Sequence, residues 1–205
     1  MAERFQDHWE KVYADKPLPQ MSWFQETPHL SLRLIEKYVR DKEAHILDIG
    51  GGDSFLVDHL LKMGYTNISV LDISSNAIDR AKKRLAGQAA QVNWIVSDVL
   101  DLGEIPAVDF WHDRATFHFL GKASQKKKYM ALAESLIKVG GYFSLGTFSD
   151  KGPEKCSGIP VSRYTEQEME ALVPGNFLVK GFQRTDHPTP FDTFQNFLFG
   201  LFEKQ

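Results

Sequence analysis

The stretch His45–Ser54, HILDIGGGDS, decides the fold. Its first half, with Ile46, Leu47 and Ile49, is apolar and mostly β-branched, which predicts a short strand in a covered parallel sheet. Three consecutive glycines, Gly50–Gly52, follow it, and the segment after them suits one buried helix face. A strand, a glycine-rich turn and a helix in this order let the backbone approach a nucleotide-like ligand closely, because glycine adopts positive φ and has no Cβ.

The acid Asp72 ends the next apolar stretch, 67–72 (NISVLD), and lies 20 residues beyond Gly52. A carboxylate at the tip of a second strand can accept hydrogen bonds from both ribose hydroxyls of an adenosine. Phe55 stands three residues after Gly52, where a dinucleotide-binding turn requires a small residue so that helix and strand pack closely. Its bulk disfavours a pyrophosphate and favours an adenosine ligand without phosphates, such as S-adenosylmethionine.

The motif HILDIGGGDS resembles the first motif of class I S-adenosylmethionine-dependent methyltransferases, whose usual form is D/E-x-G-x-G-x. The resemblance implies the cofactor S-adenosylmethionine and its product S-adenosylhomocysteine. Asp48, Gly50, Gly51 and Gly52 would then lie at the methionine part of the cofactor, with Asp48 either ordering the turn or binding the ammonium through water. The implied fold is α/β and Rossmann-like: a seven-stranded, mainly parallel sheet with a C-terminal antiparallel hairpin and helices on both faces.

Strand-like and helix-like stretches alternate along the chain from residue 45 to residue 147. Strands are expected at 45–50, 67–72, 91–97, 108–112 and 141–147, and helices at 54–63, 75–86 and 123–137, the last ended by Gly140–Gly141. This alternation is typical of right-handed βαβ units and a parallel sheet covered on both faces. The tail differs, because 177–184 and 191–203 have no helix between them; joined by the spacer 187–190, they are expected to pair antiparallel.

We expect one domain over residues 1–205, since this length suits a single core. Its expected parts are an N-terminal helical lid (1–42), a cofactor-binding core (43–150), and a C-terminal hairpin with a substrate-side loop (151–205). Within the lid, apolar spacing predicts helices at 3–15 and from Pro28 to about Arg40.

Aromatic side chains recur in the expected lid. Trp9 and Tyr13 share one face of its first helix, and Trp23 follows a proline-containing loop. These side chains could pack the helices onto the sheet, as aromatics at helical spacing commonly do. They could equally form part of the cofactor site.

The other expected strand ends also carry acids. Ligands of such sheets bind at the carboxyl ends of the strands, so Asp72 is assigned to the ribose and Ile73 to one face of the adenine. Asp98 could accept a hydrogen bond from the adenine amino group, and the Val99 N–H could donate to a ring nitrogen. Each acid could instead cap a helix, but spacings of 24 residues from Asp48 to Asp72 and 26 from Asp72 to Asp98 favour the cofactor.

The fourth strand ends in His112-Asp113-Arg114, the end that faces the transferred methyl group in such folds. His112 and Asp113 should point to opposite sides, since strand side chains alternate. Asp113 or His118 could take a proton from the acceptor, and Asp113 and Arg114 are further cofactor-binding candidates. Because methyl transfer from a sulfonium depends mainly on holding the nucleophile in line, a base is optional and His118 could be purely structural.

Over roughly residues 8–147 the chain is also similar to a methyltransferase subgroup that includes elongation-factor-1A lysine methyltransferases. The similarity follows the order Trp9-x-x-x-Tyr13, Trp23-Phe24, the glycine-rich turn, 64–74 (GYTNISVLDIS), Asp98-Val99 and 113–116. In that subgroup the early Trp, Tyr and Trp contribute to the cofactor site. Its fourth-strand motif is Asp/Glu-Lys-Gly-Thr, whereas this chain has Asp-Arg-Ala-Thr, so the resemblance leaves the acceptor open.

Composition narrows the class of protein. The chain has 24 Lys and Arg against 27 Asp and Glu, a net charge of −3, so a nucleic-acid partner is not expected. The single cysteine, Cys156, cannot form an internal disulfide, which favours a reducing, cytoplasmic location. We expect no secretory signal, no membrane span and no metal site, and a monomer or weak homodimer.

The sequence therefore predicts an S-adenosylmethionine-dependent methyltransferase that acts on a nucleophilic N, O or S atom of a protein lysine or a small molecule. One alternative is a non-catalytic protein of the same fold that binds an adenosine ligand or a partner. Another is a nicotinamide oxidoreductase, which Phe55 and the lack of a separate substrate domain disfavour.

Overall fold

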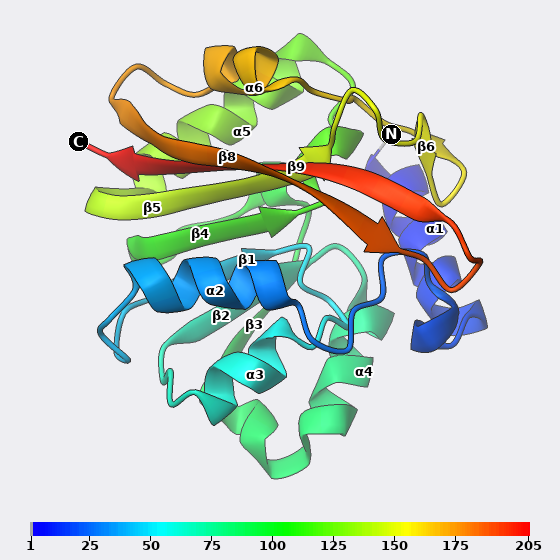
Figure 1. Ribbon diagram of the computed structural model, residues 1–205. Coiled ribbons are helices and arrows are strands. Elements are labelled where there is room, and N and C mark those ends of the chain that lie inside the picture. Colours follow the sequence, from blue (N-terminus) through cyan, green and yellow to red (C-terminus); the bar gives the residue numbers. More distant parts are fainter. Residues whose placement is uncertain (1) are drawn as a thin grey trace.

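A seven-stranded sheet runs through the centre of the computed structural model, which describes residues 2–205 (Figure 1). Its strands, in spatial order, are β3 (Val92–Val96), β2 (Ile68–Asp72), β1 (Ile46–Ile49), β4 (Val108–Arg114), β5 (Ile137–Phe148), β9 (Phe194–Lys204) and β8 (Phe177–Pro188). The first five are parallel, and β9 runs antiparallel between β5 and β8. The predicted parallel sheet closed by an antiparallel hairpin is confirmed.

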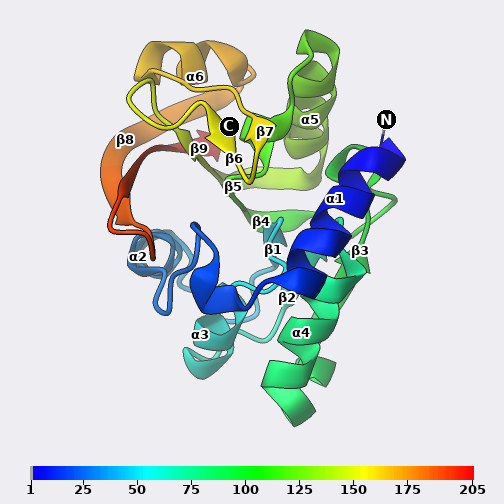
Figure 2. The same ribbon diagram turned by 90° about the vertical axis from the view of Figure 1, so that its right-hand side faces the viewer.

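Helices cover both faces of this sheet, also as predicted. One face carries α2 (His29–Tyr38), α3 (Leu56–Lys62) and α4 (Ser75–Leu85), and the other carries α5 (Ala123–Leu136) and α6 (Glu166–Leu172). The first helix, α1 (Ala2–Asp15), lies at the carboxyl ends of the parallel strands (Figure 2). Four short 3₁₀ helices complete the helical part of residues 2–205, at Leu18–Gln20, Ala86–Gln91, Val99–Asp101 and Phe117–Phe119.

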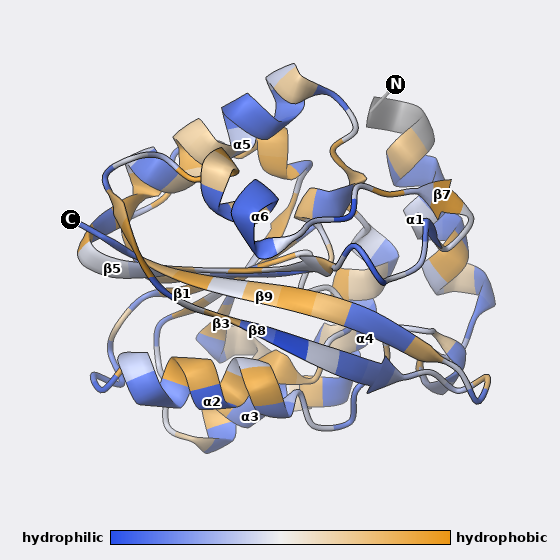
Figure 3. Ribbon diagram, turned by 45° about the horizontal axis from the view of Figure 1, so that its top comes forward, coloured by the Kyte–Doolittle hydropathy of each residue, from blue (hydrophilic) through white to orange (hydrophobic). Residues whose placement is uncertain are grey.

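The core is split by the sheet into two layers. Ile46 and Val70 pack toward α2–α4, whereas Leu47 and Trp111 pack toward α5 and α6. All residues of β1 and β2 are buried, which explains why most of them are apolar in a sheet covered on both faces. Figure 3 shows mostly hydrophobic residues along β9 and hydrophilic stretches along β8, the edge strand.

The glycine pair Gly140–Gly141 does not end a helix, contrary to the sequence prediction. Helix α5 ends at Leu136, and both glycines lie within β5. The register between β4 and β5 shifts after Val108, and Gly140 has φ +77° at this irregularity. Glycine is needed here because other residues rarely adopt such a backbone conformation.

The tail differs from the prediction in two respects. Strand β8 continues through the expected spacer to Pro188, so the turn of the hairpin comes after it, and His187 is part of the sheet. Residues expected as a loop after residue 150 contain α6 and a small hairpin of β6 (Lys155–Cys156) and β7 (Ile159–Pro160).

Within residues 2–205, none of the helices combines the length and the apolar character that a membrane crossing requires.

Candidate active site

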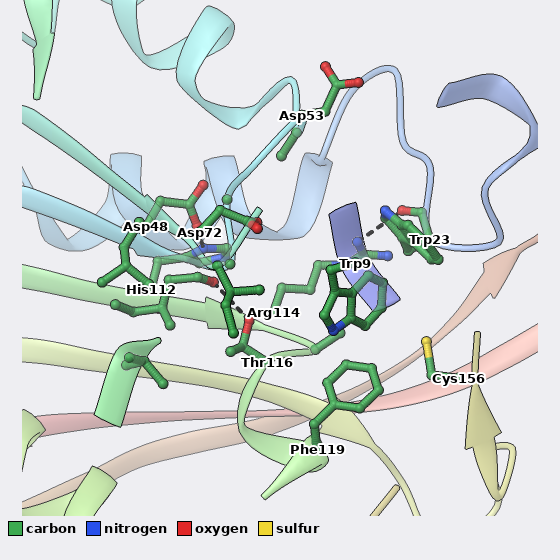
Figure 4. A pocket seen from close by; sticks show the side chains of 18 of the residues that line it. Trp9, Trp23, Asp48, Asp53, Asp72, His112, Arg114, Thr116, Phe119 and Cys156 are labelled. Atoms are coloured by element: carbon green, nitrogen blue, oxygen red, sulfur yellow. Dashed lines mark hydrogen bonds and ion pairs between the residues drawn. The ribbon is translucent and has the colours of Figure 1, made fainter. Parts of the chain in front are cut away.

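A cavity of about 420 Å³ lies at the carboxyl ends of β1–β4, against α1 (Figure 4). Its walls come from α1, from the turns that follow these strands, and from the β6–β7 hairpin. Eleven of the residues singled out from the sequence line it: Trp9, Tyr13, Trp23, Asp48, Gly50, Gly51, Asp72, Ile73, Asp98, Val99 and Arg114. Residues far apart in the chain therefore meet in one site.

The glycine-rich turn after β1 has no room for side chains. Gly50 has φ +65° and Gly52 φ +27°, both in the region that glycine favours. A Cβ on Gly51 would collide with the carboxylate of Asp48, and a Cβ on Gly52 with that of Asp72. Gly52 does not itself line the cavity; it packs against Asp72 and so lets that carboxylate approach the turn.

Asp48 is joined to a buried chain of polar side chains. The Nδ1 of His112 donates to Asp48 Oδ1 at 2.7 Å, and the Nε2 lies 2.8 Å from the Ser31 hydroxyl. All three residues are buried and line the cavity. This arrangement fixes the Asp48 carboxylate beside the glycine turn and ties α2 to the sheet.

Two arginines of α4 hold the residue that follows the glycines. Arg80 Nε lies 2.8 Å from the carboxylate of Asp53, and Arg84 also pairs with it. Arg84 in addition binds Asp58 at 2.9 Å and the Ser54 carbonyl at 2.8 Å. Burial raises the pKa of Asp53, and the two arginine charges oppose this effect. These arginines were not predicted as site residues, although their spacing of four residues places them on one helix face.

The carboxylate of Asp72 faces the cavity at the end of β2. Its Oδ1 accepts a hydrogen bond from the Ser74 N–H at 2.9 Å. Burial raises its pKa to about 7, which the Ser74 hydrogen bond opposes and the charges of Asp48 and Glu10 reinforce. Ligand hydroxyls that donate hydrogen bonds to this carboxylate would stabilise its ionised form, which burial disfavours.

The end of β3 contributes a polar and an apolar wall. Asp98 caps the following turn by accepting from the Leu100 N–H at 2.9 Å, and it also lines the cavity. Asp98 thus both caps the turn and faces the cavity, so the two alternatives for this acid are compatible. Val99 and Ile73 line the same part of the cavity with apolar surface.

The aromatic residues of the expected lid form one cluster on the cavity. Trp9 meets Trp23 edge-on at a ring separation of 5.7 Å, and Tyr13 meets Trp23 at 6.2 Å. Phe119, which the sequence analysis did not select, packs on Trp9 at 5.3 Å (Figure 4). These side chains pack α1 onto the domain and line the cavity at the same time.

Arg114, the last residue of β4, points into the cavity (Figure 4). Its Nη1 donates to the Trp23 carbonyl at 3.0 Å, and its guanidinium lies 4.9 Å from the ring centre of Phe197. Its Nη2 is buried and has no hydrogen-bond partner among the described residues. Burial lowers the pKa of Arg114 to about 10, which leaves it a cation at neutral pH.

Asp113 lies on the opposite side of the sheet and does not line the cavity, so its placement corrects the sequence assignment. Its carboxylate accepts from the Tyr129 hydroxyl at 2.5 Å and from the N–H groups of Thr116 and Phe117. Strand alternation, which turns His112 toward the cavity, turns Asp113 away from it. Asp113 therefore holds the loop after β4 in place from the side of the sheet opposite the cavity.

His118 is also outside the cavity lining, contrary to the expectation that it shares the cleft. Its ring is fully buried between Phe119 and Phe148, and its Nδ1 accepts a long hydrogen bond of 3.4 Å from the Phe148 N–H. Burial and the charge of Arg114 lower its pKa to about 3, so the ring is neutral. Cys156 does line the cavity, but burial raises its pKa to about 12 and keeps the thiol protonated.

Comparisons with known proteins agree with this geometry. The family model described as "Methyltransferase domain" matches residues 46–141. The zebrafish EEF1A lysine methyltransferase 2 is 26% identical over 186 residues, covering 87% of this chain and 70% of that protein. The bovine eEF1A lysine and N-terminal methyltransferase is 26% identical over 143 residues, which are 68% of this chain and only 20% of that protein.

Solved structures resemble the fold over nearly its whole length. A methyltransferase from Anabaena variabilis described as SAM-dependent superposes with a TM-score of 0.75, at 14% identity, covering 100% of this chain and 95% of that one. The N-methyltransferase NodS from Bradyrhizobium japonicum, in complex with S-adenosylhomocysteine, has a TM-score of 0.73 at 13% identity, covering 97% and 98%.

The sheet order, the glycine turn and the acid at the end of β2 define a class I methyltransferase fold with an adenosine-type cavity. Together with the comparisons, in which the methyltransferase-domain model matches residues 46–141, they support a class I S-adenosylmethionine-dependent methyltransferase that is distantly similar to the eEF1A lysine methyltransferases. The residues present fit that cofactor, because the Cβ-free turn, the desolvated Asp72 and the adjoining apolar wall lie in one cavity.

Proposed function

We propose that this protein transfers the methyl group of S-adenosylmethionine to a nucleophilic atom of a small-molecule acceptor. The observation that carries the choice of acceptor is the distribution of charge around the cavity. Among the described lining residues, every carboxylate belongs to the β1–β3 side, namely Asp48, Asp53, Asp72 and Asp98. The wall from β4 onward carries the cations Arg114 and Lys122, which disfavour a lysine ammonium there.

The cofactor-facing roles follow the order of the strand ends. We assign Asp72 to the ribose hydroxyls, Asp98 and the Val99 N–H to the adenine edge, and Ile73 to its face. Asp48 and the turn Gly50–Gly52 are assigned to the methionine end. The aromatic cluster of Trp9, Tyr13 and Trp23 covers the cavity and excludes water. When bound, the cofactor supplies a methyl group on a positively charged sulfur with a neutral leaving group.

The chain's own contribution to the reaction is positioning. Asp113 and His118 lie outside the cavity lining, and the Cys156 thiol is protonated, so none of them serves as a base in direct contact with the acceptor. Alignment alone can supply a large part of the acceleration when the leaving group is good. We infer that Arg114 at the end of β4 and Phe119 in the loop fixed by Asp113 align the acceptor.

A protein lysine is the second candidate acceptor, and the similarity to eEF1A lysine methyltransferases supports it. Incubation of the protein with labelled S-adenosylmethionine and a cell lysate separates the two, because counts then appear either in protein or in the small-molecule fraction. Transfer to small molecules supports our proposal. Transfer to protein alone would contradict our proposal and support a protein lysine as the acceptor.

Calorimetric titration with S-adenosylhomocysteine tests the cofactor independently of the acceptor. We expect micromolar binding by the wild type, loss of binding by Asp72→Ala, and no binding of NADH. Absence of S-adenosylhomocysteine binding would instead favour the partner-binding alternative, and preferential NADH binding the oxidoreductase one. The helical lid (1–42), the core (43–150) and the C-terminal part (151–205), a cytoplasmic location and a monomer or weak homodimer remain predictions.

A further inference from the structure

A second cavity, of about 250 Å³, adjoins the first one. It lies between the N-terminal end of α2 and the β8–β9 hairpin, and it shares Gln25, Ser31 and Arg114 with the first cavity. The guanidinium of Arg114 thus stands where the two spaces meet. A group bound in the second cavity would be held next to the cofactor-type site without occupying it.

The described lining of the second cavity is cationic and contains no acid. Its cations are Arg33 and Arg114, and the imidazole rings of His29 and His187 and hydroxyl and amide side chains such as Thr27 and Gln25 complete it. Arg33 is exposed and makes no ion pair within the described part of the chain. The positive end of the α2 dipole lies at the same place.

Arg114 supplies the second, independent indication of a ligand. Its Nη1 is occupied by the Trp23 carbonyl, whereas its buried Nη2 has no hydrogen-bond partner among the described residues. The carboxylate of Asp48, whose charge acts on Arg114, is already bonded to His112. A buried cation without a counterion is costly unless a ligand provides the missing acceptor.

His187 contributes shape rather than charge. Its Nε2 lies 2.8 Å from the Ser22 carbonyl and its Nδ1 lies 3.4 Å from the Gln25 amide nitrogen, so both ring nitrogens are engaged. Burial and the charge of Arg114 lower its pKa to about 4, which keeps it neutral. The two arginines are therefore the cations that a ligand would meet.

We propose that this second cavity binds a carboxylate of the methyl acceptor, so that the acceptor is an anionic small molecule. The inference rests on the proposed function, because it names the substrate class of that site. Arginine recognises carboxylates through paired N–H donors, and the free Nη2 of Arg114 with the exposed guanidinium of Arg33 provides them from two sides. The carboxylate of the cofactor itself is the competing source of the same chemistry.

The test uses succinate as the probe, titrated calorimetrically into the protein saturated with S-adenosylhomocysteine. We expect wild-type binding, and about tenfold weaker binding in Arg33→Gln, since one charge-assisted contact is removed. Arg40→Gln is the matched control, because Arg40 is also exposed, follows the same helix and lines neither cavity. Methylammonium chloride, a mimic of a lysine side chain, should not bind.

Three outcomes would overturn the inference. The first is no succinate binding by the saturated wild type at millimolar concentration, and the second is an equal loss in the Arg33 and Arg40 variants. In the third, Arg33→Gln weakens S-adenosylhomocysteine but not 5′-methylthioadenosine, which lacks the amino-acid tail; the cavity then holds the cofactor's carboxylate. Failure of the wild type to bind S-adenosylhomocysteine is a separate result that overturns the proposed function itself.

Discussion

Two buried acids, Asp72 and Asp113, have the same direction of pKa shift but different surroundings. Burial raises the pKa of each to about 7. Asp113 is surrounded by donors from Tyr129 and the following loop, whereas Asp72 faces a cavity and receives the Ser74 N–H. Asp113 is therefore a structural acid, and Asp72 retains acceptor capacity for a ligand.

The variant Asp72→Asn tests whether Asp72 serves ligand binding at a cost to the stability of the fold. An acid whose folded pKa lies above its unfolded value binds protons preferentially in the folded state, so its contribution to stability falls as pH rises from about 4 to about 7. Removing the charge should raise the ligand-free protein's unfolding free energy at pH 8 by ~1–3 kcal/mol, with little change near pH 4.

Asp72→Asn should also bind S-adenosylhomocysteine at least about tenfold more weakly, because an amide accepts fewer hydroxyl hydrogen bonds than a carboxylate. Urea unfolding at both pH values measures the change in stability, and calorimetry with S-adenosylhomocysteine measures the change in affinity. A variant that is destabilised at pH 8, or that binds the ligand unchanged, would contradict the assignment of Asp72.

At the scale of elements, α4 fastens the glycine-rich turn. Arg84 bridges Asp53, Asp58 and the Ser54 carbonyl, so Arg84→Met would leave two shielded carboxylates with fewer partners. We expect a loss of ~3 kcal/mol in unfolding free energy and weaker S-adenosylhomocysteine binding. Lys83→Met, at an exposed neighbouring position, is the control for charge loss in denaturant unfolding. Equal behaviour of the two variants would show that the bridge is dispensable.

A carboxylate of helix α1, that of Glu10, binds the first turn of α4. Glu10 accepts hydrogen bonds from the first turn of α4, among them the Ser75 N–H at 2.7 Å and the Asn76 N–H at 3.0 Å. Burial would raise the pKa of Glu10, but these hydrogen bonds lower it overall. A depressed acid stabilises the fold above its unfolded pKa and ceases to do so as pH falls.

Glu10→Gln should therefore loosen the attachment of α1 at neutral pH. We expect S-adenosylhomocysteine to dissociate about three- to tenfold faster and the amides of α1 to exchange faster. The reason is that a charged carboxylate forms stronger hydrogen bonds to the N-terminus of α4 than a neutral amide does. Stopped-flow displacement and hydrogen exchange measure the two effects. Asp7→Asn on the same helix, which is exposed, should leave both unchanged; if it acts like Glu10→Gln, the capping contact is not what holds α1 in place.

Sequence patterns predicted the strands and helices of the core and missed elements of the C-terminal part. Strands β1 and β2 are mostly apolar, and the positions of Asp48 and Asp72 within them indicated which residues would face a ligand. Helix α6 has only seven residues, yet Thr165 and Glu168 form a capping box that the sequence analysis did not use. The extension of β8 to Pro188 depends on its pairing with β9, which no local pattern specifies.

At the scale of the whole molecule, distant segments close one cavity. The N-terminal helix α1, the strand ends of the core and the β6–β7 hairpin all contribute walls. Motif spacing therefore predicted many lining residues, but not the side chains that depend on tertiary packing. Arg84 and Phe119 fall in that second group, because each depends on contacts between elements. Strand alternation predicted that His112 and Asp113 point to opposite sides, but not which of the two faces the cavity.

A ligand that contacts all these segments should stabilise the molecule as one unit. Binding to the folded state alone at a concentration 100 times Kd adds about 2.7 kcal/mol. For a chain of this length that corresponds to a rise in Tm of roughly 5–10 °C. Thermal unfolding with S-adenosylhomocysteine should show this rise in a single transition, with NADH at the same concentration giving none. A rise confined to part of a split transition would mean that α1 and the hairpins unfold separately from the core and do not share in the site.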